Sequence, residues 1–207
     1  MSGTAQTQSS TGHALIPRML HHYARVTHDV AATADFYNRI LGMPIASTIM
    51  DDHVPSTGDD FPYFHIFFRM GDGATLAFFE CADLPERAPA SHPAYDVFDH
   101  IALQVKDQIE LLEWKTRLQG LGVEVLGPID HKGLIHSIYF HDPNGYRLEL
   151  TTSIDPSWNR HEALARADLS AWLETKQQAQ SEGKNIAQAL IGLIRRTKEE
   201  RYAKKGY

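Results

Sequence analysis

The sequence is poor in cysteine, in basic residues and in long apolar runs, and each shortage excludes a class of protein. Its 207 residues contain one cysteine, Cys81, which excludes an internal disulfide and favours a reducing, cytoplasmic compartment. Lys and Arg number 20 against 26 Asp and Glu, and the formal net charge of -6 argues against nucleic-acid binding, which needs a basic surface. No segment approaches the roughly 18 consecutive apolar residues of a membrane span, so we expect no membrane partner.

The first 18 residues lack the apolar core of a signal peptide, and we interpret residues 1–18 as a disordered tail. Because no CxxC pair is present, any metal site has to consist of histidine and carboxylate side chains. Twelve histidines are many for a chain of this length. The task is therefore to find which histidines share one face of the fold.

An internal repeat organises the chain. Residues 22–42 read HYARVTHDVAATADFYNRILG and residues 100–122 read HIALQVKDQIELLEWKTRLQGLG. In both segments a histidine opens a strand-like run, and an aspartate (Asp29, Asp107) follows seven residues later at the position of a helix N-cap. Each helical pattern then closes on a glycine, as helix C-termini commonly do.

Three strand-like runs follow each helical pattern. In the first half they are MPIASTIM, YFHIFFRM and ATLAFFEC, and in the second VEVLGPI, HSIYFHD and YRLELTT. We therefore predict an α+β fold of two βαβββ modules, residues 19–81 and 98–154, joined by a linker at 82–97. Neither module has enough core to stand alone, so we expect the two to pack together as a curved mixed sheet around a metal cavity.

Residues 155–207 differ in composition and predict a C-terminal helical extension. Two helices, at 162–180 and 184–204, flank a short turn that contains Gly183. Apolar residues recur at helical spacing in the second helix, which predicts a surface helix packed on the core or across a dimer. Because this stripe and the sheet edges need covering, we expect a homodimer or a larger homo-oligomer.

The two repeated histidines and one carboxylate are the candidate metal ligands. Strand alternation places His100 and His22 on the face turned away from the helix, although a one-residue shift of register would exchange His22 for His21. Glu149 stands between two leucines, and a buried carboxylate needs a compensating charge, which a divalent cation supplies. Two imidazoles and one carboxylate are typical of non-haem Fe(II) sites that keep open positions.

These paired modules resemble the vicinal-oxygen-chelate superfamily, which includes glyoxalase I, fosfomycin and bleomycin resistance proteins, and type I extradiol dioxygenases. The most specific stretch is residues 129–149, IDHKGLIHSIYFHDPNGYRLE, which is similar to the extradiol ring-cleavage signature. The run HYARVTHD followed by DFYNRILG resembles the first ligand strand and helix of those enzymes.

The resemblance implies a metal-dependent oxidoreductase of aromatic catabolism, an extradiol-type dioxygenase that opens the ring of a catechol-like small molecule. It implies that His22, His100 and Glu149 are the Fe(II) ligands. It also implies that Tyr139 and His131 hydrogen-bond the bound substrate or dioxygen during catalysis.

Two positions depart from the resemblance. Extradiol enzymes place an acid/base histidine where Ala74 or Thr75 stands here, and His65 on the neighbouring strand is the candidate to replace it. Glyoxalase I uses a carboxylate as its fourth metal ligand at the position where Ala77 stands here, and this departure counts against glyoxalase I itself. A non-oxidative isomerase or lyase that uses Mn, Ni, Co or Zn is therefore the alternative. A metal-free, ligand-sequestering resistance protein is less favoured, because it has no need of two matched histidines and a lone glutamate.

Overall fold

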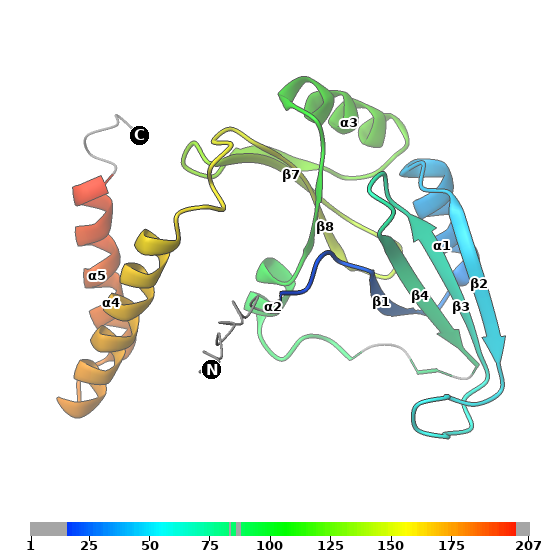
Figure 1. Cartoon of the computed structure of the whole chain (residues 1–207), viewed down its shortest axis with the longest axis horizontal. Helices are drawn as coiled ribbons and strands as arrows, with labels where there is room; N and C mark the ends of the chain where they lie inside the picture. The colour runs from blue at the N-terminus through cyan, green and yellow to red at the C-terminus, as the bar shows by residue number, and fades with distance from the viewer. Residues whose placement is uncertain (1–15, 83, 86–87, 202–207) are drawn as a thin grey trace, which may run out of the picture. The chain divides into compact units, whose positions relative to one another are not determined.

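The structure is a computed structural model and describes residues 16–82, 84–85 and 88–201. Most of the tail expected at residues 1–18, and the end of the helix expected at 184–204, lie outside the described residues. The chain divides into two compact units, residues 1–91 with 142–146, and residues 92–141 with 147–207. Each unit contains one four-stranded sheet (Figure 1).

The first unit contains the first βαβββ module. Its elements are β1 (His22–Thr27), α1 (Val30–Ala34), the π-helical segment η1 (Asp35–Ile40), β2 (Ile45–Asp51), β3 (Tyr63–Arg69) and β4 (Thr75–Cys81). The strand order is β1-β4-β3-β2, with β1 parallel to β4 and the other pairs antiparallel. Asp29 caps α1 by accepting a hydrogen bond from the Ala32 N–H at 2.9 Å.

The second unit repeats this plan. Its elements are α2 (Pro93–Phe98), β5 (Ile101–Gln104), α3 (Gln108–Gly120), β6 (Leu126–Asp130), β7 (Ile135–His141) and β8 (Arg147–Ser153). The strand order β5-β8-β7-β6 repeats the first sheet, again with one parallel pair, β5 with β8. Asp107 caps α3 at 2.9 Å, and the residues that end the helical segments, Gly42 and Gly122, have φ of 72° and 80°. The predicted α+β fold of two βαβββ modules is confirmed.

Helix α2 was not expected, because its residues fall at the end of the proline- and alanine-rich linker. His92 caps it through Nδ1, which accepts from the Ala94 N–H at 3.1 Å, and Pro93 occupies the first turn, where its missing N–H costs nothing. A six-residue helix shows too little periodicity to be recognised from sequence.

Helices cover one face of each sheet. In the first unit, Tyr37 is fully buried from η1 and lies 5.3 Å from Phe68 and 4.8 Å from Phe78, measured between ring centroids. In the second unit, Leu111 and Leu118 of α3 are fully buried and α3 contacts β7 and β8. Side chains that alternate with this core lie on what we call the helix-free face of each sheet.

The turn between β7 and β8 belongs to the first unit. Asp142 Oδ1 accepts from the backbone N–H groups of Asn144 and Tyr146 at 2.9 and 2.8 Å, which fixes the turn. Asn144 Oδ1 accepts from the Thr27 hydroxyl at 2.7 Å, and the Tyr37 hydroxyl donates to Asp142 Oδ2 at 3.0 Å. The Asp-Pro-Asn-Gly-Tyr run of the ring-cleavage signature therefore holds the fold together.

The C-terminal extension is an antiparallel helical hairpin of α4 (Glu162–Ser181) and α5 (Ile186–Arg201), as expected (Figure 1). The two helices contact each other along their length. In the part of the chain that the structure describes, no helix is long and apolar enough to cross a bilayer.

Candidate functional site

His100 and Glu149 meet on the helix-free face of the second sheet. Glu149 on β8 is 2% exposed, and its Oε2 lies 2.8 Å from His100 Nε2. His100 precedes β5, and its Nδ1 lies 2.7 Å from the carbonyl oxygen of Phe98, at the end of α2. Because a carbonyl can only accept, Nδ1 carries a proton and donates it to this carbonyl, and Nε2 faces the carboxylate.

This pair fits a divalent cation. Two lone pairs at 2.8 Å repel, so a proton or a cation has to lie between Nε2 of His100 and Oε2 of Glu149. Neighbouring ligands of an octahedral site, each about 2.1 Å from the metal, are about 3 Å apart. A carbonyl that fixes the tautomer of a histidine is also the usual partner of a metal-binding imidazole.

Two hydroxyl groups lie beneath the carboxylate. Ser137 on β7 is fully buried and donates a short hydrogen bond to Glu149 Oε1. Its oxygen lies 3.0 Å from the Thr151 hydroxyl, which also contacts the carbonyl oxygen of His136 at 3.2 Å. Glu149 therefore has a partner at each oxygen.

Tyr139 and His131 form a second pair beside His100. The Tyr139 hydroxyl and His131 Nε2 share a hydrogen bond of 2.8 Å, and the Tyr139 ring packs edge-on to His100 at 6.0 Å between centroids. The guanidinium of Arg147 lies 4.2 Å from the Tyr139 ring centroid. Burial, and then the charge of Glu149, raise the pKa of Tyr139, so its hydroxyl keeps its proton. The structure thus brings four of the six predicted site residues together.

The other two predicted residues, His22 and His65, share the helix-free face of the first sheet. His22 opens β1, and its ring lies 6.0 Å from that of Phe67; its Nδ1 is 2.8 Å from Nδ1 of His21, which precedes the strand. This register places His22 on the same face as Ala24 and Ala77, and the choice of His22 over His21 as the ligand stays a prediction. The complete ligand set of His22, His100 and Glu149 stays a prediction, because its members belong to both units.

His65 on β3 is 7% exposed and stacks on Phe79 at 3.5 Å between ring centroids, with Phe67 at 4.0 Å. Its Nε2 is buried and has no hydrogen-bond partner among the described residues. Burial, and secondarily the charge of His22, lower the pKa of His65 to about 4. The imidazole is therefore neutral near pH 7, with a nitrogen available to a ligand.

The matching strand registers make the two sheets directly comparable. Ala24 pairs with Ala77 across β1 and β4, as Ala102 pairs with Glu149 across β5 and β8. The cross-strand pairs Phe67–Ala77 and His65–Phe79 of the first sheet correspond to Tyr139–Glu149 and Ser137–Thr151 of the second. Ala77 therefore stands at the repeat position of Glu149, and the first half contributes no carboxylate there.

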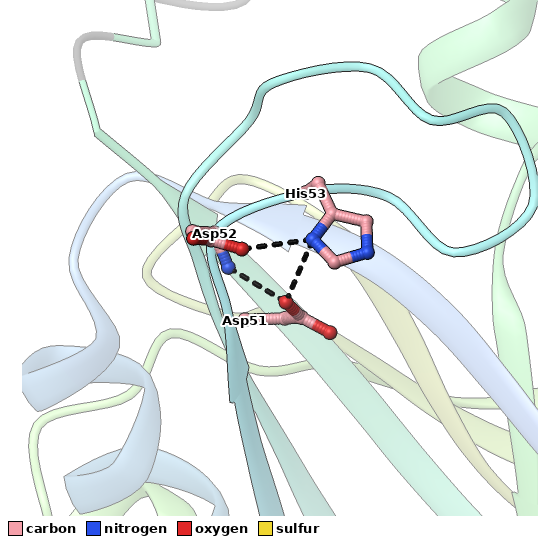
Figure 2. A group of neighbouring side chains, drawn as sticks. All are labelled: Asp51, Asp52 and His53. Carbon is pink, nitrogen blue, oxygen red and sulfur yellow. Dashed lines mark hydrogen bonds and ion pairs between the residues drawn. The ribbon is translucent and has the colours of Figure 1, made fainter.

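A separate group of three side chains that could bind a metal ion, Asp51, Asp52 and His53, lies where β2 ends (Figure 2). His53 Nδ1 is 2.8 Å from Asp52 Oδ1 and 3.2 Å from Asp51 Oδ1, and the hydrogen bond to Asp52 raises the pKa of His53. Within the described residues this is the one group of His, Cys, Asp or Glu with three donor atoms inside 4.8 Å. Exposed acidic groups of this kind are common without an ion, and we assign it no function.

Sequence reasoning missed two contributors to the site. Ser137 was detectable, because it stands two residues before Tyr139 and period two puts both on the face of Glu149. The carbonyl of Phe98 had no signal, because any residue supplies a carbonyl and α2 itself was not expected.

Two curated proteins are similar to parts of this chain. Metallothiol transferase FosB of Bacillus licheniformis is 38% identical over 82 residues, which are 39% of this chain and 49% of that protein. The protein named "Putative ring-cleaving dioxygenase MhqA" of Bacillus subtilis is 29% identical over 137 residues, 64% of this chain and 39% of that protein. The chain thus spans less than half the length of either relative.

Among solved structures, the chain is similar to a variant of the fosfomycin resistance protein FosX from Listeria monocytogenes, complexed with Mn(II) and 1S,2S-dihydroxypropylphosphonic acid. The identity is 23% and the TM-score 0.48, covering 70% of this chain and 98% of that one. Residues 19–150, which contain the first module and the second as far as the middle of β8, match a single family model. The chain belongs to the Glyoxalase/Bleomycin resistance protein/Dioxygenase superfamily.

Proposed function

We propose that this chain is a metal-dependent enzyme, with His22, His100 and Glu149 as ligands, that opens the ring of a catechol-like aromatic with dioxygen. The observation that carries the proposal is the contact between His100 Nε2 and Glu149 Oε2, with the Tyr139–His131 pair directly beside it. A metal held there, as Fe(II), supplies Lewis-acid activation of the diol and electrons for dioxygen. MhqA, whose name gives a ring-cleaving activity, supports this reaction class.

Tyr139 and His131 handle protons in this proposal. Tyr139 stays protonated because burial and Glu149 raise its pKa, so its hydroxyl donates to an oxygen of the substrate. His131 Nε2, at 2.8 Å, exchanges a proton with that hydroxyl. A proton that leaves the diol thus has a route away from the reacting oxygens.

His65 is the proposed second acid/base group. It is neutral near pH 7 because its pKa lies at about 4, and its unpartnered Nε2 accepts a hydrogen bond from a substrate hydroxyl. The flanking rings of Phe67 and Phe79 provide an apolar surface that suits an aromatic ligand. Ala77, at the repeat position of Glu149, limits the protein ligands to three and leaves coordination positions for substrate and oxygen.

A non-oxidative reaction is the second candidate, and the likeness to FosB favours it. FosB is named a metallothiol transferase, and the same three ligands with Mn, Ni, Co or Zn suit an addition, isomerisation or elimination that uses no oxygen. A metal-free sequestering protein stays the least favoured proposal, because a buried Glu149 facing His100 serves no purpose in it.

Oxygen dependence separates these proposals. We would purify the protein without air, measure its metal content, load it with Fe(II) and record oxygen uptake over a panel of substituted catechols. Ring cleavage predicts one oxygen consumed per yellow ring-opened product, a much slower uptake with Tyr139→Phe, and none with Glu149→Gln. Turnover of a substrate without oxygen, or with Mn or Zn in place of iron, supports the non-oxidative reaction instead.

We also propose that the chain forms a homodimer through the α4–α5 hairpin. Ala179 is the one buried residue among the described residues of this hairpin. Six large apolar side chains are 38–57% exposed: Leu164, Leu169, Trp172, Leu173, Ile191 and Ile194. They leave roughly 500 Å² of apolar surface in water, close to the apolar share of a standard interface of about 800 Å² per partner.

A second copy of the same hairpin is the occupant that fits. Leu169, Trp172 and Leu173 follow helical i, i+3, i+4 spacing on α4, and Ile191 and Ile194 follow i, i+3 spacing on α5. Trp172 of α4 and Ile194 of α5 line one groove of about 260 Å³, so these two side chains lie on the same side of the hairpin. Two such hairpins bury these stripes against each other as a four-helix bundle.

A further inference from the structure

Ser137 stands at a position where the strand itself needs no side-chain hydroxyl, because backbone groups form the hydrogen bonds of a strand. It lies in the middle of β7, is fully buried, and directs its side chain to the helix-free face between Glu149 and Thr151. A buried hydroxyl destabilises the fold unless it is hydrogen-bonded, because it loses its hydrogen bonds to water. Its hydrogen-bond partners therefore indicate what it does.

The protons at this cluster can be assigned. A carboxylate only accepts, so the single hydroxyl proton of Ser137 points to Glu149 Oε1. The lone pairs of Ser137 then face the Thr151 hydroxyl at 3.0 Å, whose own proton is shared with the His136 carbonyl at 3.2 Å. With Oε1 occupied, Oε2 is the oxygen left to face His100 Nε2 at 2.8 Å.

We infer that Ser137 is a positioning residue for the metal, which holds Glu149 so that a single oxygen, Oε2, is presented beside His100. This inference rests on the proposed metal site. A glutamate has three rotatable side-chain bonds, and freezing them beforehand removes an entropic cost that metal binding otherwise has to meet. Groups that orient a ligand typically change metal affinity by about 10–100-fold.

The first sheet provides an internal reference for this inference. His65 stands at the repeat position of Ser137, and Ala77 at that of Glu149. Where the carboxylate is absent, the hydroxyl is absent too, and an imidazole packed between two phenylalanines fills its place. Serine therefore accompanies the carboxylate and is not a general requirement of this strand position.

The test is a titration of metal-free protein with Mn(II), followed by electron paramagnetic resonance, for wild type and four variants. Ser137→Ala removes the donor. Ser137→Cys keeps a similar size with a weaker donor. Ser153→Ala makes the same change as Ser137→Ala at the exposed end of β8, and Glu149→Gln removes the ligand charge. Urea unfolding of each metal-free variant shows that the fold is retained.

We expect the Mn(II) dissociation constant to rise about 10–100-fold for Ser137→Ala, by a smaller factor for Ser137→Cys, and not at all for Ser153→Ala. If Ser137→Ala binds like wild type while Glu149→Gln does not bind, the positioning role is wrong and the metal site stands. If Glu149→Gln binds as tightly as wild type, the metal site itself is wrong. Should Ser137→Ala not fold, wild-type affinity in Ser137→Cys would overturn the inference.

Discussion

The two sheets share strand order and register, yet their helix-free faces differ in chemistry. Where the second sheet has Glu149 and Tyr139, the first has Ala77 and Phe67 at the same repeat positions. The second face is a connected polar cluster, with a polar partner at each carboxylate oxygen and a hydrogen bond at the phenol. The first face is mainly aromatic around His65.

This difference indicates a division of labour within a duplicated fold. In the proposed metal site, the second half would supply the carboxylate and the phenol, and the first half would supply a histidine and aromatic side chains. A symmetric site would have two histidines and two carboxylates, which fill more of the coordination sphere and suit chemistry without dioxygen. Replacing one carboxylate by Ala77 is the simplest way to leave positions open.

The largest expected effect concerns the carboxylate that only one half retains. Glu149→Gln, His100→Ala and His22→Ala should each reduce bound metal to about a tenth of the wild-type content or less, because each removes one of three protein ligands. Metal content after anaerobic purification measures this by mass spectrometry.

His21→Ala and Asp52→Asn are the matched controls, and both should keep their metal. Loss of metal in His21→Ala together with retention in His22→Ala would show that the first-half ligand is misassigned by one residue. Loss in Asp52→Asn would point instead to the exposed group at the end of β2.

The second prediction concerns Tyr139 and Phe67, which stand at equivalent positions of the two sheets. Tyr139→Phe should keep its metal but lower kcat about 100-fold or more, because a positioned proton donor contributes about that much. Phe67→Tyr, the converse change in the first sheet, adds a phenol beside His22 and His65, where Ala77 stands at the repeat position of Glu149, and should change kcat much less, by about threefold at most. Steady-state kinetics on the best catechol measures both. Equal losses in the two variants would mean that aromatic packing matters and the phenol does not.

Much of this fold could be predicted from the sequence because the repeat shows the same pattern of residues twice. Asp29 and Asp107 were recognisable as N-caps since a short acceptor side chain before an apolar helical pattern has one common structural purpose. The alternation in β5 and β8 put His100 and Glu149 on one face for the same reason. Their contact at 2.8 Å is the local part of the site that sequence could predict.

The remainder depends on contacts between segments far apart in sequence. Asp142 and Asn144 belong to the stretch that resembles a ring-cleavage signature. In the structure Asp142 binds the backbone of its own turn, and the two side chains also bind Tyr37 and Thr27, which lie over a hundred residues earlier in the sequence. The role of Phe98 rests on a backbone carbonyl, which leaves no trace in residue identity. Periodicity finds faces of strands and helices, but it does not find such partners.

The third prediction concerns the hairpin, which has no counterpart in the first half. Trp172→Glu should raise the dimer dissociation constant at least about 30-fold, because it places a charge at the centre of the proposed apolar interface. Gln177→Glu adds the same charge at an exposed polar position of α4 and should not change assembly. Analytical ultracentrifugation at micromolar concentration distinguishes the two. A wild-type monomer would contradict the dimer, and a Trp172→Glu dimer would move the interface elsewhere.

The smallest expected effect tests the residue that replaces Ser137 in the first sheet. The pKa of His65 is lowered from 6.5 to about 4, mainly by burial and secondarily by His22, and unfolding restores the ordinary value. Between about pH 6.5 and pH 4 His65 therefore binds a proton in the unfolded chain but not in the folded chain, so the free energy of unfolding decreases as the pH falls through this window.

In metal-free protein, His65→Phe should abolish this part of the pH dependence while keeping the aromatic stack. The Tm of wild type should fall about 4–7 °C more than that of the variant between pH 7 and pH 5. His141→Gln, an exposed histidine in the second unit, should behave like wild type. If wild type and His65→Phe show the same pH dependence, the pKa of His65 is the same in the folded and unfolded chain, and burial does not lower it.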